Sequence, residues 1–258
     1  MQRFGAGCLV GSFLERIGPG GLLVFFSLES TSELSVAETR ILRGFTVEVE
    51  EEILASDPKL AAEALDVLDA RLLDIERALP FEALAALRRV PFFLGKEDAL
   101  HPCACYHVSR EWLVEHGYPA RKAGSVDIAN AGNFLSWTKT QPSLVLHELA
   151  HAYYHQVLEC EDAGLRAAFE KARASGTYEE VLHFDGEEVR HYAMTNENEY
   201  FAELTEAYYG VNDFYPFVRA ELRRHDPDGF EAVATAWRRL DPVPSEGVTT
   251  TPSRDGGR

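Results

Sequence analysis

Basic residues are scarce in this chain of 258 residues, which has 25 Lys and Arg against 42 Asp and Glu and a formal net charge of −17. Proteins that bind a phosphate backbone use clustered Lys and Arg side chains to displace its counterions. The sequence has no such cluster, and its acidic surface would repel phosphate groups. We therefore expect no nucleic acid and no anionic lipid surface among its partners.

Cysteine is also rare, and long hydrophobic runs are absent. The four cysteines, Cys8, Cys103, Cys105 and Cys160, are too few and too scattered to form a disulfide framework. The sequence is therefore compatible with an oxidising or a reducing compartment. The apolar run over residues 21–26 is far too short to span a membrane and is interpreted as a buried strand or, alternatively, part of an unusual export signal. We expect a soluble monomer without a membrane span, either cytoplasmic or secreted through an unrecognised N-terminal signal.

Local patterns predict strands in the first half and helices in the second, which is typical of the α+β class. Residues 1–43 have no clear period and are expected to form an N-terminal arm, residues 44–240 one domain, and the Pro- and Gly-rich residues 241–258 a disordered tail. Strands are expected over residues 45–50, 90–94, 103–108 and 125–129. Helices are expected over residues 58–79, 81–89, 110–116, 142–158, 164–174, 196–209, 217–224 and 229–240.

The strongest local signal is an H-E-x-x-H motif, His147-Glu148-Leu149-Ala150-His151, inside the apolar helix over residues 142–158. Two imidazoles four residues apart lie on one helix face, where they can bind a single zinc ion, and the adjacent glutamate can reach a water molecule there. The alternative is an ordinary amphipathic helix with two surface histidines. The apolar residues on both sides of the pair argue against that alternative.

A catalytic zinc site needs a third protein ligand. His155 is excluded because it lies about 12 Å along the helix from His147. The third histidine of a metzincin is absent, since Tyr154 and Val157 occupy the relevant positions. Downstream, Asn196 can cap a helix that carries three glutamates on neighbouring turns, of which one can ligate zinc and another can orient a ligand histidine. The alternative is a solvated acidic face. The three glutamates are Glu199, Glu203 and Glu206.

These motifs resemble the gluzincin metallopeptidases, in particular the catalytic domains of anthrax lethal factor and the Pro-Pro endopeptidases. The resemblance rests on the H-E-x-x-H motif and on a Tyr-x6-Glu-x3-Glu spacing, and it covers about a third of the chain, residues 125–209. It implies a zincin-like metallopeptidase domain with a small mixed sheet, an edge strand over the zinc and several packed helices. The implied roles are zinc ligands for His147, His151 and Glu199, general base for Glu148, transition-state stabilisation for Tyr192, and orientation of a ligand for Glu203.

The resemblance also implies that an edge strand before the active-site helix pairs with extended substrate, and residues 125–131, including Asn130 and Ala131, are the candidate. The alternative is an ordinary sheet edge. For the oxyanion partner of that family, His183 and His191 are near enough in sequence to be considered. We expect a zinc-dependent endopeptidase that acts on a peptide or protein through Glu148. The alternatives are a catalytically silent zinc-fold protein that binds a peptide or partner, and a zinc hydrolase of a small amide.

Four further potential donors alternate in sequence: His101, Cys103, Cys105 and His107. Such a set suits zinc or copper chemically. On a straight strand, however, successive side chains on one face are about 7 Å apart, so four of them cannot surround one ion. The favoured interpretation is a buried strand.

Overall fold

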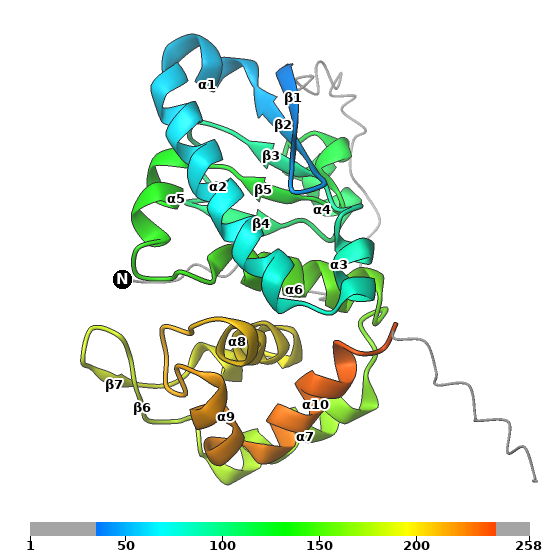
Figure 1. Ribbon diagram of the computed structural model, residues 1–258, viewed down its shortest axis with the longest axis vertical. Helices are drawn as coiled ribbons and strands as arrows, with labels where there is room; N and C mark the ends of the chain where they lie inside the picture. Colours follow the sequence, from blue (N-terminus) through cyan, green and yellow to red (C-terminus); the bar gives the residue numbers. More distant parts are fainter. Residues whose placement is uncertain (1–34, 241–258) are drawn as a thin grey trace, which may run out of the picture.

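The computed structural model describes residues 35–240, and they form an α+β fold (Figure 1). In Figure 1 the main sheet and the helices that precede α6 in the chain lie above α6, and the helices that follow it lie below. The apolar run over residues 21–26, most of the expected arm and the expected tail fall outside the described residues. Among those described, no helix is long and apolar enough to cross a membrane.

The main sheet is mixed and has five strands in the order β1-β2-β3-β5-β4. Its three inner strands are parallel, and each outer strand is antiparallel to its neighbour. A two-stranded sheet, β6-β7, lies apart from it. The strands are β1 (Val36–Leu42), β2 (Phe45–Glu50), β3 (Phe92–Leu94), β4 (Ala104–Tyr106), β5 (Val126–Ile128), β6 (Val181–Leu182) and β7 (Glu188–Val189).

The first two strands form a hairpin that corrects the expected domain start. Leu42 pairs with Phe45 across a two-residue turn, and Arg43 and Gly44 both have positive φ angles, of 51° and 87°. Two successive positive φ angles are typical of the tight turns that join twisted antiparallel strands. The expected boundary between residues 43 and 44 therefore falls inside this turn, and Val36–Leu42 belongs to the folded domain.

From α6 onward the helices agree with the expected ones, and two short helices before α6, α1 and α5, were not indicated by the patterns. The long helix α2 begins as expected: the Asp57 side chain accepts a hydrogen bond from the Leu60 backbone N–H at 3.0 Å, and Pro58 is its first residue. The helices are α1 (Glu51–Ser56), α2 (Pro58–Ala78), α3 (Phe81–Leu87), α4 (Arg110–Glu115), α5 (Ala131–Trp137), α6 (Leu144–Gln156), α7 (Ala163–Ser175), α8 (Glu197–Tyr209), α9 (Arg219–His225) and α10 (Pro227–Ala236), with short 3-10 turns η1 (Ala120–Lys122) and η2 (Tyr192–Thr195).

Helix α6 is buried over almost its whole length. It contacts β4 and α2 on the side of the sheet and α8 on the other side. Leu149 and Tyr153 have no exposed surface, and the Tyr153 ring stacks on Trp237 with ring centroids 4.3 Å apart. This packing explains why apolar residues flank the H-E-x-x-H motif in the sequence, and it fixes the motif between the sheet and α8.

Candidate metal centre

Three potential metal donors from α6 and α8 converge on one point. Nε2 of His147 and Nε2 of His151 lie 3.0 Å apart, as their spacing of one helical turn predicts. Oε2 of Glu199 lies 3.2 Å from the first nitrogen and 3.4 Å from the second. Helix α8 presents Glu199 in its first turn, where the Asn196 side chain accepts a hydrogen bond from the Glu199 backbone N–H. Donor atoms about 2 Å from a tetrahedral zinc ion are about 3.3 Å from one another, so these three groups fit one ion.

The other nitrogen of each imidazole is already engaged. Nδ1 of His147 donates to Oε1 of Glu206 at 2.7 Å, and Nδ1 of His151 donates to Oδ1 of Asn198 at 2.9 Å. When a metal ion takes the place of the proton on Nε2, each ring is neutral with its remaining proton on Nδ1, and the lone pair of Nε2 points toward the Glu199 carboxylate. Three electron-rich atoms so close together repel one another unless a proton or a metal ion lies among them, so the arrangement suits a metal ion that displaces the proton.

The residue that orients His147 is Glu206 rather than the expected Glu203. Oε1 of Glu203 is 3.5 Å from Nδ1 of His147, beyond hydrogen-bond length for these atoms, and its Oε2 accepts a hydrogen bond from Asn212 at 3.0 Å. The expected role for Glu203 is corrected on this geometry. Asn198, the partner of His151, had no signal in the sequence beyond its place next to Glu199.

Ionisation at the centre follows from this packing. Burial opposes charge on His147, but its hydrogen bonds to Glu199 and Glu206 outweigh that effect and raise the pKa of His147 well above its usual value. Burial likewise opposes ionisation of Glu199, yet the two imidazoles outweigh it and lower the pKa of that carboxyl. The centre therefore holds a localised negative charge on Glu199 and favours positive charge beside it.

Glu148 lies on the side of α6 that faces the sheet. Its Oε2 accepts a hydrogen bond from the backbone N–H of Tyr106, in β4, at 2.8 Å. Burial raises the pKa of Glu148 above its usual range, although the neighbouring His147 and His151 oppose this rise. A buried carboxylate with a raised pKa that is held next to the donor set is well suited to accept and return a proton.

The edge strand of the sheet is β4, not the expected segment over residues 125–131. Strand β5 is an inner strand with β3 on one side and β4 on the other. Asn130 caps α5 by accepting a hydrogen bond from the Asn133 backbone N–H, and Ala131 is the first residue of that helix. The assignment of Asn130 and Ala131 to a substrate-binding edge is therefore wrong.

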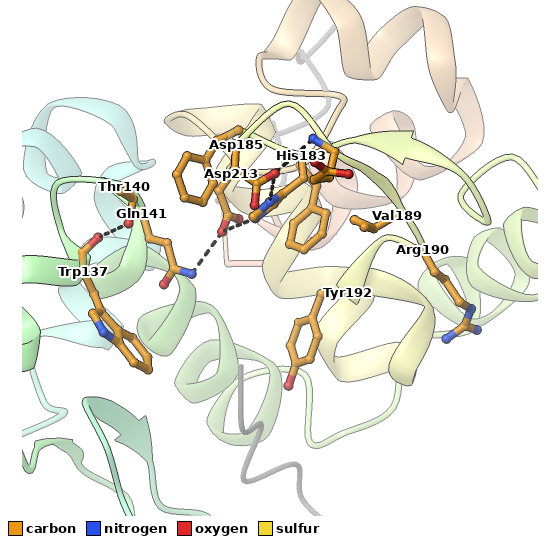
Figure 2. Close-up of a pocket in the computed structure, with 12 residues that line it drawn as sticks. Trp137, Thr140, Gln141, His183, Asp185, Val189, Arg190, Tyr192 and Asp213 are labelled. Carbon is orange, nitrogen blue, oxygen red and sulfur yellow. Dashed lines mark hydrogen bonds and ion pairs between the residues drawn. The ribbon is translucent and has the colours of Figure 1, made fainter. Parts of the chain in front are cut away.

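Tyr192 lies in η2, just before α8, and lines a pocket of about 450 Å³ (Figure 2). The same pocket is lined by His183, whose Nδ1 is 2.8 Å from Oδ1 of Asp185. Figure 2 shows the Tyr192 ring extending away from the pair formed by His183 and Asp213. His191 is instead only 1% exposed and accepts a hydrogen bond from the Ala193 backbone N–H. Of the two histidines considered from the sequence, His183 is therefore the one at the pocket.

The centre thus combines two imidazoles, a carboxylate ligand candidate and a buried carboxylate. This set can bind a metal ion and transfer a proton. No family model, curated protein or solved structure matches the chain, so these residues and their geometry alone indicate what it does.

Proposed function

We propose that this chain is a zinc-dependent endopeptidase of the gluzincin type with a zincin-like domain. The observation that carries the proposal is the convergence of three donor atoms while both Nδ1 atoms are hydrogen-bonded elsewhere. His147, His151 and Glu199 would hold the ion. Two histidines and one glutamate are typical of a catalytic zinc site rather than a structural one, because three protein ligands leave the fourth coordination position open.

Glu148 is the proton carrier in this proposal. When bound, zinc supplies a Lewis acid that polarises a peptide carbonyl and lowers the pKa of water. Glu148 takes the proton from the attacking water and returns it to the leaving amine. The Tyr106 N–H fixes one oxygen of this carboxylate, so that the other oxygen can meet the water. The Tyr192 hydroxyl would stabilise the negative charge that develops on the carbonyl oxygen.

An extended peptide substrate would pair with β4. In the described part of the chain this strand has a neighbour on one side only, and the backbone of His107 bonds toward β5. Because backbone groups alternate along a strand, those of Ala104 face the opposite way, toward the open edge. Main-chain pairing at this edge would place the substrate beside Glu148, which the same strand holds through Tyr106.

The pocket beside Tyr192 would receive a substrate side chain. Its walls combine aromatic rings with three acidic residues and one arginine, a composition that favours a neutral or basic side chain. The aromatic residues are Trp137, Phe184, Tyr192 and Phe214, the acidic ones are Asp185, Glu187 and Asp213, and the arginine is Arg190.

Metal analysis and cleavage of a peptide library, on the full chain and its Glu148→Gln variant, test the proposal. We expect equal zinc content in the two proteins and a loss of cleavage of roughly 10²–10⁴-fold in the variant. Glu161→Gln, a change at an exposed glutamate beyond α6, is the matched control and should cleave normally. Zinc without any cleavage would favour a protein that only binds peptides. Cleavage restricted to small amides would favour a small-amide hydrolase, and full activity of Glu148→Gln would refute the mechanism.

A further inference from the structure

A second group of potential metal donors lies on the face of β4 that points away from α6. One potential ligand atom from each of His101, Cys105 and His107 falls within 4.8 Å of the other two. Side chains alternate between the two faces of a strand. The Tyr106 side chain points toward α6, where its hydroxyl is 2.8 Å from Nδ1 of His155, so Cys105 and His107 point away from α6.

The three donors meet because His101 is not part of the strand. Strand β4 begins at Ala104, and His101 belongs to the preceding loop. The Asp98 side chain bends this loop by accepting a hydrogen bond from the His101 backbone N–H at 2.8 Å. The spacing of about 7 Å along a straight strand therefore does not apply to His101. Cys103 is buried but does not belong to the group.

The two imidazoles are arranged like those of the first centre. The rings of His101 and His107 have centroids 5.0 Å apart and cross at 87°, whereas those of His147 and His151 are 4.6 Å apart and cross at 86°. His107 also has a carboxylate behind it, because its Nε2 lies 3.2 Å from Oδ2 of Asp127. Sγ of Cys105 lies 3.6 Å from Nε2 and 4.0 Å from Nδ1 of His107. Because Nε2 donates to Asp127, Nδ1 keeps its lone pair for an ion.

Two buried polar atoms in this region have no hydrogen-bond partner. They are Nδ1 of His101, which is 3% exposed and lies 3.4 Å from Oδ1 of Asp98, and Oδ1 of Asp127, which is fully buried. Buried polar atoms are nearly always satisfied, so such exceptions point to an ion or water that belongs there. The nearby carboxylates also outnumber the lysines: two of them contact one lysine, and a third lies beside His101. The carboxylates are Asp98, Asp127 and Glu50, and the lysine is Lys122.

We propose that His101, Cys105 and His107 form a second zinc site, separate from the centre on α6 and α8. One thiolate and two imidazoles suit zinc, and Asp127 would fix the ring of His107 as Glu206 fixes that of His147. On binding, the zinc ion replaces the thiol proton of Cys105, which passes to solvent. The ion would tie the loop before β4 to the strand itself. This inference does not depend on peptidase activity.

Replacement of zinc by cobalt(II) in the full chain tests the second site directly. A thiolate bound to cobalt gives a sulfur-to-metal charge-transfer band in the near ultraviolet, and the first centre contains no sulfur ligand. We expect this band in the wild type and in His151→Gln, and its loss in Cys105→Ser. Cys160→Ser, at an exposed cysteine, is the matched control and should keep the band.

Zinc content gives an independent measurement. We expect two zinc ions per chain in the wild type and one in each of Cys105→Ser and His151→Gln. If Cys105→Ser fails to fold by circular dichroism, His101→Gln, a change in the loop outside the strand, provides the same test. The second site is refuted if the wild type lacks the band, if the band survives in Cys105→Ser, or if neither Cys105→Ser nor His101→Gln lowers the zinc content.

Discussion

Nδ1 of His147 and Oε1 of Glu206 lie 2.7 Å apart, so the histidine that meets Glu199 through one nitrogen is held by Glu206 through the other. Glu206 is fully buried and accepts this hydrogen bond inside the protein. The hydrogen bond fixes the orientation of the imidazole and makes Nε2 a stronger donor toward a metal ion.

Glu206→Gln is therefore expected to weaken zinc binding by about 10- to 100-fold, because a neutral amide oxygen is a poorer acceptor. Competition with a chromophoric chelator measures this affinity. Glu203→Gln is the matched control, since Glu203 lies on the same helix and is equally buried but more distant from His147. A larger loss of affinity in Glu203→Gln than in Glu206→Gln would contradict the assignment.

Tyr192→Phe tests the assigned role of the tyrosine hydroxyl in cleavage. If this hydroxyl stabilises charge that is present only in the transition state, its removal lowers kcat by roughly 10²-fold and leaves KM and zinc content nearly unchanged. Steady-state kinetics on a cleaved library peptide give both constants. Tyr209→Phe, at the other end of α8, should behave as the wild type. A rise in KM at constant kcat would instead make Tyr192 a substrate-binding residue.

The N-cap of α8 can be tested apart from catalysis. Asn196→Ala removes the side chain that accepts the hydrogen bond of the Glu199 N–H, and should reduce the free energy of unfolding by about 1 kcal/mol. Asn196→Asp keeps an acceptor at this position and should reduce the free energy of unfolding by less than the alanine variant does. Urea denaturation in the presence of a chelator separates the effect on the helix from the effect of lost zinc. Equal stability of the alanine variant and the wild type would show that the cap is dispensable.

Lys122 is a buried cation between two carboxylates. Its Nζ lies 2.9 Å from Glu50 and 2.7 Å from Asp127. Burial opposes its charge, but the two carboxylates outweigh burial and raise the pKa of Lys122 above 10.5. Because the folded-state pKa is raised, the stabilisation is complete below the unfolded-state pKa and disappears as pH rises through the folded-state value.

Lys122→Met should therefore lower the free energy of unfolding at pH 7 by roughly 3–5 kcal/mol, since it leaves Asp127 buried without its cation. The difference from the wild type should shrink above pH 10.5, where the wild-type lysine begins to lose its proton. Urea denaturation at pH 7 and pH 11 measures both effects. Lys139→Met, at an exposed position, is the control. A difference that grows toward pH 11 would contradict the sign of this linkage.

Local patterns identified the two helices that build the metal centre. The four-residue spacing of His147 and His151 marks one face of α6, and Asn196 marks the start of α8. The choice between Glu203 and Glu206 could not be made in this way, because both lie on the face of Glu199, four and seven residues along the helix. The way α6 and α8 pack decides which of them reaches His147.

The edge of the sheet was not predictable because strand order is not a local property. Strands β4 and β5 are both short and both lie before α6, and only their pairing shows that β4 is outermost. Strand β1 had no signal because most of its residues are exposed at the opposite edge. The convergence of His101 with Cys105 depends on a loop bend at Asp98. The alternation of His101, Cys103, Cys105 and His107 indicated one straight strand and gave no sign of this bend.

Strand β4 would serve both proposed sites through one register. Tyr106 pairs with Val126, and this pairing directs its N–H toward Glu148 while Cys105 and His107 lie on the other face. A slip of one residue against β5 would reverse every side chain of the strand. Glu148, the proposed base, would then lose its backbone donor and the Cys105 thiol would leave the two imidazoles, so both proposed sites would fail together. An insertion or deletion of one residue in β4 is therefore more damaging than most single substitutions within either site.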